Sequence, residues 1–263
     1  MELIGERING MFSDIKEAII NKDPRPVEFW ARSQAEKGAD YLDLSTGPAV
    51  PASEQPLVME WLVKTVQGAT GLPCCLDSTN PEAIEAGLKV HRGRAIINST
   101  SADQDKINLY FPMALKYNAK IIGLTMNEKG IPKDAASRIA LAMELVVGAD
   151  MHGLAMRDLY IDPLVLPVNV AQDHCPEVIE TIRQIKLLAD PPPRTIIGLS
   201  NVSQRCSERR LLNRTFLVMC MSAGLDSCIL DVEDDELLKA AAAASVLLNR
   251  EVYCDAFIKT FRR

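Results

Sequence analysis

The chain has 263 residues, of which 48% are hydrophobic and 24% charged, and its formal net charge at pH 7 is −6. The negative charge argues against nucleic acid as the main partner, because neutralising phosphates requires a basic surface. No apolar stretch is long enough to cross a bilayer and no signal peptide opens the chain, so we expect a cytoplasmic protein without membrane contact.

Short apolar segments rich in Ile, Leu, Val and Cys alternate along the chain with segments of helical periodicity. Nearly continuous apolarity is typical of strands buried on both faces, as in a parallel sheet with crossover helices. We predict eight strands, near residues 2–8, 41–46, 73–78, 94–99, 120–126, 158–163, 194–200 and 228–232.

Helix signals fill the stretches between these strands. Asn80 before Pro81 predicts an N-cap and a first turn, and Asp134 precedes an apolar stripe at helical spacing. We also predict a helix pair within residues 9–38 and a terminal helix from residue 250 onward.

About eight strand–helix units in roughly 250 residues match the size of a (β/α)8 TIM barrel. We therefore predict a TIM barrel that forms a single domain over residues 1–263. A doubly wound open sheet stays as the alternative, because periodicity does not distinguish a closed sheet from an open one.

Most of the predicted strands end in a carboxylate or a carboxamide. An unpaired acid at the end of a buried strand is costly, and the carboxyl ends of barrel strands share the face on which active sites lie. We therefore expect one site that contains Asp43, Asp77, Asn98, Asp162, Asn201 and Asp231, with Glu6, Arg7, Asn9 and Asn127 as further candidates.

The competing interpretation is that some of these residues only begin turns or cap helices. It is strongest for Asp231, which leads into an acidic helix start, and it also applies to Asn127, which lies in a turn. For Asp231 we expect helix capping.

Carboxylates and amides together suit a flat heterocycle that carries an amino group, a ring N–H and a carbonyl. A pterin and a guanine both fit this description, and the residues alone do not choose between them. His174-Cys175 has no further ligand at zinc-like spacing, and the seven cysteines include no Cys-x-x-Cys pair, so we expect reduced thiols and no metal.

Several segments resemble the pterin-binding family, which includes dihydropteroate synthase and the folate-binding region of cobalamin-dependent methionine synthase. Within this family the chain most resembles the methyltetrahydrofolate:corrinoid/iron–sulfur protein methyltransferases, over essentially its whole length. The segments that carry the resemblance are residues 4–10, 76–79, 97–100, 123–127, 160–164, 169–174 and 198–203.

The resemblance implies a homodimer that moves the methyl group of 5-methyltetrahydrofolate to the Co(I) corrinoid of a corrinoid/iron–sulfur protein in the reductive acetyl-CoA pathway. It also implies that Asp77, Asn98 and Asp162 bind the pterin and that Gly198, Ser200 and Gln204 line the same site. Asn201 would lie near N5, the methylated nitrogen.

Asp43 fits the second-strand position of the family, although Leu44-Ser45 stands where the family often has an Asn beside it. We expect Asn201 and Asp43 to be the catalytic residues, acting through a hydrogen-bond network that stabilises the protonating N5. Arg205, Arg209, Arg210 and Arg214 follow the seventh strand, where they either meet a ligand or form a solvated helix face.

Three alternatives stay open: a methyltransferase that serves another corrinoid protein, a dihydropteroate synthase-like enzyme, and a non-catalytic pterin-binding subunit. The synthase family ends in a Ser-x-Arg-His type of segment, which residues 257–263 do not match.

Overall fold

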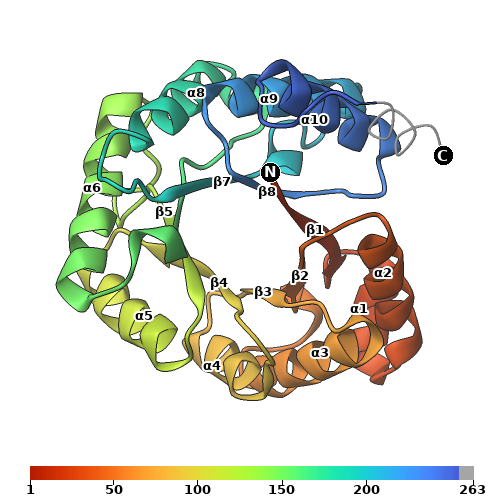
Figure 1. Cartoon of the computed structure of the whole chain (residues 1–263). Helices are drawn as coiled ribbons and strands as arrows, with labels where there is room; N and C mark the ends of the chain where they lie inside the picture. The colour runs from red at the N-terminus through yellow and green to blue at the C-terminus, as the bar shows by residue number, and fades with distance from the viewer. Residues whose placement is uncertain (255–263) are drawn as a thin grey trace.

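Eight parallel strands close into a barrel in the computed structural model, which describes residues 1–254 (Figure 1). Neighbours in the barrel are neighbours in the chain, and β1 also pairs with β8 to close the ring. The strands are β1 (Glu2–Asn9), β2 (Tyr41–Ser45), β3 (Cys74–Asp77), β4 (Ile96–Ser101), β5 (Lys120–Leu124), β6 (Leu159–Asp162), β7 (Arg194–Gly198) and β8 (Ser227–Leu230). This confirms the predicted TIM barrel and excludes the open sheet.

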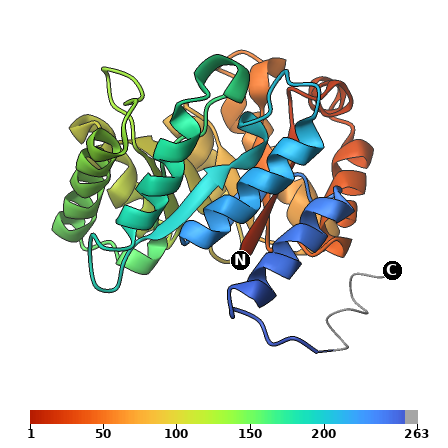
Figure 2. The ribbon, with the colours of Figure 1, turned by 90° about the horizontal axis from the view of Figure 1, so that it is seen from above.

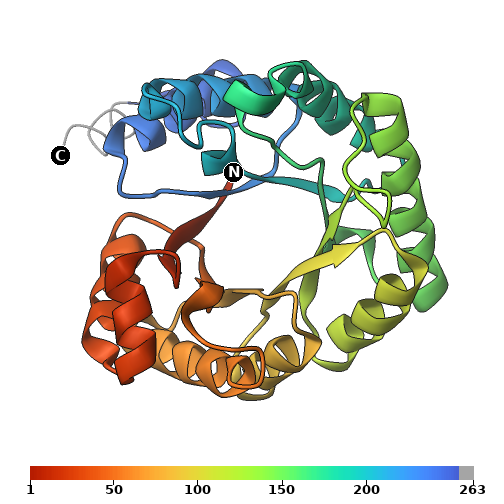
Figure 3. The same ribbon diagram turned by 180° about the vertical axis from the view of Figure 1, so that it is seen from behind.

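The α-helices form an outer ring around the strands, as the views from the two ends show (Figures 1 and 3). They are α1 (Ser13–Asn21), α2 (Pro24–Glu36), α3 (Gln55–Thr70), α4 (Pro81–Val90), α5 (Gln104–Lys116), α6 (Ala135–His152), α7 (Val168–Ala171), α8 (His174–Ile185), α9 (Arg209–Ala223) and α10 (Asp235–Leu247). Single 3-10 turns are η1 (Gly47–Ala49), η2 (Met156–Asp158) and η3 (Leu199–Asn201).

Local sequence signals explain several of the helix starts. The side chains of Asn80 and Asp134 accept hydrogen bonds from the first turns of α4 and α6, as predicted. The helix pair within residues 9–38 is confirmed as α1 and α2. Residues 250–254 are not helical, and the rest of the predicted terminal helix lies outside the described residues.

The capping role that we predicted for Asp231 is wrong. The N-cap of α10 is Asp234, whose side chain accepts from the backbone N–H of Leu237. The Asp231 carboxylate instead accepts from the N–H of Glu233 and closes a turn before the helix begins.

Side chains of each strand alternate between two apolar layers. One layer packs between the sheet and the helices, and a smaller one fills the middle of the barrel. The inner layer consists of Ile4, Tyr41, Cys75, Ile96, Ile122, Tyr160 and Ile196, with Leu124 and Ile229 packed against it. This plug divides the barrel interior into two ends.

The end at the start of the strands is closed by a polar network. The Glu2 carboxylate accepts hydrogen bonds from Lys120 Nζ (3.1 Å) and from the Tyr160 hydroxyl (2.8 Å), and Arg194 lies 3.6 Å away. Figure 2, turned by 90° from Figure 1 so that the barrel axis lies in the page, places the N-terminus at this lower end. In the part of the chain that the structure describes, no helix is long and apolar enough to cross a membrane.

Candidate active site

The opposite end of the barrel collects the predicted strand-end acids. Residues two positions apart on a strand point to the same face, so each inner-layer residue is followed by an inward neighbour at the carboxyl end. These neighbours are Glu6, Asp43, Asp77, Asn98, Leu124, Asp162, Gly198 and Asp231. One level of the barrel therefore contains five carboxylates and one carboxamide.

Asp43, Asp77 and Asn98 lie on the neighbouring strands β2, β3 and β4 and form one side of this level. Asn98 Nδ2 donates to Asp43 Oδ1 at 3.1 Å, and Asn98 lies in register with Asp77 on the neighbouring strand. Asp43 is only 4% exposed. Burial raises the pKa of Asp43 and Asp77, and the charge of Asp77 raises that of Asp43 further. The two acids together therefore hold a proton more tightly than free carboxyls do.

Asp162 follows on β6 and is also buried. Burial raises its pKa to about 7, against the opposing effects of the Leu164 N–H, which donates to its carboxylate at 2.7 Å, and of the Arg138 charge. The backbone N–H of Thr125 donates to the Asp162 carbonyl, which joins the end of β6 to the end of β5. The Asp162 side chain is thus fixed in place and can accept further donors.

The predicted residues of the seventh strand lie in or next to the 3-10 turn η3 that follows it. Ser200 Oγ donates to Glu6 Oε1 at 2.6 Å, which ties this turn to β1. Asn201 and Gln204 are exposed, and the Gln204 N–H donates to the Asn201 carbonyl. The Asn201 amide nitrogen approaches Gly198 so closely that a Cβ there would lie 3.0 Å from it, so glycine leaves this amide its space.

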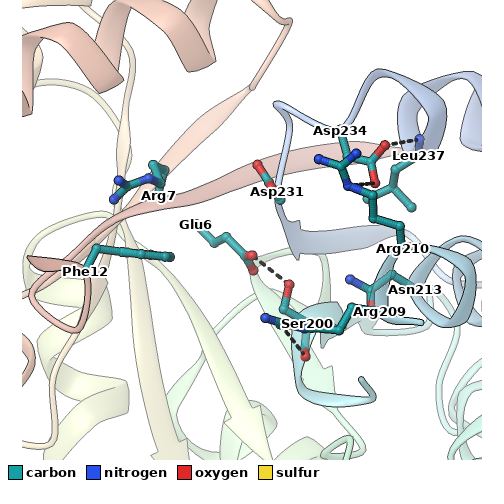
Figure 4. A pocket seen from close by; sticks show the side chains of 10 residues that line it. All are labelled: Glu6, Arg7, Phe12, Ser200, Arg209, Arg210, Asn213, Asp231, Asp234 and Leu237. Carbon is teal, nitrogen blue, oxygen red and sulfur yellow. Dashed lines mark hydrogen bonds and ion pairs between the residues drawn. The ribbon is translucent and has the colours of Figure 1, made fainter. Parts of the chain in front are cut away.

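A cavity of about 300 Å³ opens beside this turn (Figure 4). Its lining comes from the ends of β1 and β8 and from the starts of α1, α9 and α10: Glu6, Arg7, Phe12, Ser200, Arg209, Arg210, Asn213, Asp231, Asp234 and Leu237. Of the predicted pterin-binding residues only Ser200 lines it. Asp77, Asn98 and Asp162 lie on β3, β4 and β6, so the cavity flanks their part of the barrel mouth.

Glu6 is the acid that links the cavity to the strand-end level. Figure 4 shows its carboxylate directed at Ser200, with Arg209 beside them. Burial raises the pKa of Glu6, and the nearby Asp231 raises it further, whereas the Ser200 hydrogen bond and Arg209 oppose this. Sequence reasoning named Glu6 only as a further candidate and gave Asp231 to a helix cap.

Two of the four arginines after β7 face this cavity. Arg209 donates from Nε to Ser203 Oγ (3.2 Å) and from Nη2 to the Ser200 carbonyl (3.4 Å). Arg210 and Arg214 each lie 4.0 Å from Asp234. The ligand-facing interpretation therefore fits Arg209 and Arg210, and Asn213 is a lining residue that the sequence did not indicate.

The other candidates serve local structure. The Asn9 and Asn127 side chains accept from the N–H groups of Met11 and Lys129 and so form turns. Arg7 is paired with Asp14 and lies 4.1 Å from the ring centres of both Phe12 and Trp30, which holds it at the rim of the cavity. Within residues 1–254, no three His, Cys, Asp or Glu side chains are grouped as a metal site.

Comparison with known proteins places this site in a family. The model of the family described as pterin binding enzymes matches residues 6–231, a segment that contains every strand-end residue of the site. The chain belongs to the pterin-binding enzyme family.

Two relatives place this pterin-binding enzyme among methyltransferases. The methylcorrinoid:tetrahydrofolate methyltransferase of Eubacterium limosum is 30% identical over 269 residues, which cover 100% of this chain and 97% of that protein. The methionine synthase of Mycobacterium tuberculosis is 31% identical over 240 residues, covering 86% of this chain but only 20% of that longer protein. The predicted family and enzyme class, a methyltransferase, are thereby confirmed.

Solved structures confirm the fold. The dihydropteroate synthase of Xanthomonas albilineans with 4-aminobenzoic acid superposes with a TM-score of 0.70, covering 96% of this chain and 94% of that chain. At 17% sequence identity, this likeness concerns the fold alone.

Proposed function

We propose that this pterin-binding enzyme transfers a methyl group between N5 of a tetrahydrofolate and the cobalt of a corrinoid that another protein carries. The observation that carries the proposal is the level of five acids and one amide at the carboxyl end of the strands, where none of the acids has an ion-pair partner among residues 1–254. The full-length identity to a methylcorrinoid:tetrahydrofolate methyltransferase supports it.

The residues at this level suit a pterin. Asp77 and Asp162 offer carboxylate oxygens for the amino group and ring N–H, and the Asn98 amide can donate and accept at once. The side-chain nitrogen of Asn98 donates to Asp43, and this orientation leaves the side-chain oxygen, Oδ1, available to a donor of the ligand. These three residues bind the pterin in our proposal, and Gly198, Ser200 and Gln204 line the adjoining turn.

The chemical difficulty lies at N5. A methylated N5 is a tertiary amine and a poor leaving group, so it needs positive character in the transition state, and the reverse transfer needs that proton removed. The partner corrinoid supplies the cobalt that donates or accepts the methyl group. Asn201 and Asp43, with Asp77 and water, form the network that stabilises the protonating N5.

The raised pKa of Asp43 and Asp77 suits this task. Burial of both acids, and the charge of Asp77 near Asp43, raise the pKa at which these carboxyls release a proton, so the pair can hold a proton and release it toward the network. The same pair can take a proton back, because an enzyme lowers the barrier of both directions equally.

In its finer form, the proposal is transfer from 5-methyltetrahydrofolate to the Co(I) corrinoid of a corrinoid/iron–sulfur protein, by a cytoplasmic homodimer in the reductive acetyl-CoA pathway. Transfer from a methylcorrinoid protein to tetrahydrofolate is the second candidate, favoured by the name of the Eubacterium limosum relative. A dihydropteroate synthase-like activity has only fold similarity behind it; residues 257–263, which bear on it, lie outside the described residues.

The test mixes the protein anaerobically with 5-methyltetrahydrofolate and a Co(I) corrinoid protein and follows methyl–cobalt formation by absorbance. A second arm starts from the methylcorrinoid protein and tetrahydrofolate. Transfer in either arm supports the proposal, and the faster arm at matched substrate concentrations gives the preferred direction. If the protein binds folate but transfers no methyl group to or from a corrinoid protein, the proposal is overturned in favour of a non-catalytic pterin-binding subunit.

Asn201→Ala tests the role given to the network. We expect transfer to slow by about 100-fold, while the Kd for 5-methyltetrahydrofolate changes by less than about threefold, since the amide acts on the transition state. Asn108→Ala, an exposed amide on α5, is the matched control. Equal losses in rate and affinity would assign Asn201 to binding alone.

A further inference from the structure

An arginine lies buried behind the site without a carboxylate partner. Arg138, on α6, has no exposed surface, and in the described part of the chain no acid lies within ion-pair distance of it. Its Nε donates to the Pro132 carbonyl at 3.0 Å, and its Nη2 donates to His174 Nδ1 at 2.8 Å. Its Nη1 is buried without a hydrogen-bond partner.

Such a placement is expensive for a charged group, because a buried guanidinium normally needs a carboxylate and a full set of acceptors. Arg138 instead has two neutral acceptors. The negative charges of three acids, Glu177, Asp162 and Asp134, stabilise its protonated form from a longer distance. Glu177 is engaged elsewhere, since its Oε2 accepts from the Ala135 N–H at the start of α6 (2.7 Å). Asp162 is the one of the three that belongs to the strand-end level.

His174 places this arginine in contact with the connection between β6 and α8. That connection, residues 163–173, begins directly after Asp162 and ends where His174 begins α8. It also touches the next turn, because the Val168 N–H donates to the Val202 carbonyl at 2.9 Å, beside Asn201. Arg138 therefore holds the far end of a loop that begins at the proposed pterin ligand Asp162 and touches the turn of Asn201.

We propose that Arg138 and His174 are a positioning pair for the pterin site. From beyond ion-pair distance the Arg138 charge favours the ionised form of Asp162, and its bond to a neutral His174 fixes the loop of residues 163–173. This inference rests on the proposed function, since it takes Asp162 as a ligand of the pterin.

The proposed role of the pair depends on pH, because Asp162 and His174 both titrate. Burial raises the pKa of Asp162 and Arg138 lowers it, so loss of the Arg138 charge raises it further. Burial and the charges of Arg138 and Lys133 lower the pKa of His174, against Asp173 and Glu177, so Nδ1 stays an acceptor near neutral pH. Protonation of His174 would turn this acceptor into a donor that faces the guanidinium.

The experiment measures the Kd of 5-methyltetrahydrofolate, without corrinoid, from about pH 5.5 to 9.5. The wild-type protein should bind best above the pKa of Asp162 and lose affinity as the pH falls. In Arg138→Gln this loss should begin about one pH unit higher, so that binding is about fivefold weaker at pH 7 and recovers near pH 9. Arg138→Lys keeps the charge and should restore the wild-type pH profile.

A second pair of variants tests the loop and covers the case in which Arg138→Gln does not fold. His174→Leu removes the acceptor but keeps the Arg138 charge, so affinity should fall at all pH values without a shift of the profile. Asn carries an oxygen near the position of Nδ1, so His174→Asn should recover the affinity that His174→Leu loses.

Three outcomes separate the inference from its basis. If the wild-type protein binds no folate, the proposed function fails. If it binds, and Arg138→Gln loses affinity equally at every pH, Arg138 is a structural residue and the counter-charge role is overturned. If His174→Leu binds as the wild-type protein does, the pair does not position the loop.

Discussion

Glu2 and Glu6 lie on the same strand and both point into the barrel, but their surroundings are opposite. Glu2, at the start of β1, accepts from Lys120, Tyr160 and Ser227. Although burial opposes its ionisation, Lys120 and Arg194 lower the pKa of Glu2 below its usual value. Glu6, at the carboxyl end, has one hydrogen-bond donor, Ser200, and burial raises its pKa.

The same contrast holds for the two ends of the barrel as a whole. At the lower end a carboxylate is matched by cations and hydroxyls, which is an arrangement that stabilises a fold. At the upper end Asp43, Asp77 and Asp162 have no cation within ion-pair distance in residues 1–254, and burial raises the pKa of each. Acids that the fold leaves unpaired are available to a ligand.

The largest expected effect is a pH-dependent gain in stability from Asp162→Asn. The native pKa of about 7 exceeds the ordinary value of 3.8, so the native state binds this proton more tightly than the unfolded state. The stability that this proton provides is complete below about pH 4 and is lost as the pH rises through 7. The Asn variant avoids this loss, so its advantage over the wild type should grow to on the order of 3 kcal/mol at pH 8.

Urea unfolding of the ligand-free protein between about pH 4 and 8 measures this difference. Asp105→Asn, on the exposed side of α5, is the matched control and should give a constant difference. If the stability of the wild type and of Asp162→Asn changes with pH in the same way, burial does not disfavour the ionised form of Asp162.

The second effect is on folate binding by the same variant. Asp162→Asn replaces an acceptor of charge-assisted hydrogen bonds by an amide, so the Kd for 5-methyltetrahydrofolate should rise by about 100-fold at pH 8. Calorimetric titration measures it. Gain of stability together with loss of binding is the signature of an unpaired functional acid, and unchanged affinity would remove Asp162 from the site.

The third effect reverses this signature at the other end. Glu2→Gln removes the carboxylate that Lys120 and Arg194 share in a partly buried polar network. The free energy of unfolding should therefore fall by about 2 kcal/mol. Folate affinity should not change, because the apolar plug separates Glu2 from the site. Thermal and urea unfolding check the first part, with the exposed Glu17→Gln of α1 as control.

The sequence was sufficient to predict the strand-end acids of the site, because the features that indicate them lie within single segments of the chain. Strand-end acids such as Asp77 and Asp162 follow apolar segments, and the period of two in a strand determines which face they occupy. Helix starts are less certain by a few residues, and for that reason Asp231 was assigned the capping role of Asp234.

Other parts of the site depend on contacts between distant segments. Glu6 meets Ser200 across 194 residues of chain because β1 and β8 close the barrel. Arg138 belongs to a helix in which a charged residue is expected to face solvent, and only the packing of α6 against α8 buries it. No pattern within a single segment indicates either contact.

The smallest predicted effect tests whether a residue binds folate because its side chain lacks a partner or only because it lies at the barrel mouth. Asn80 lies at the same end of the barrel as Asp77, but its side chain is satisfied, since Oδ1 accepts from the Glu82 N–H and Nδ2 donates to the Ala52 carbonyl, both at 3.0 Å. Asn80→Ala should therefore cost about 1 kcal/mol of stability and leave folate affinity unchanged. Asn80→Asp, which keeps the capping oxygen, should recover most of the loss. If folate affinity falls together with stability in Asn80→Ala, a position at the barrel mouth matters in itself, and the absence of a partner is no longer sufficient to identify the functional residues.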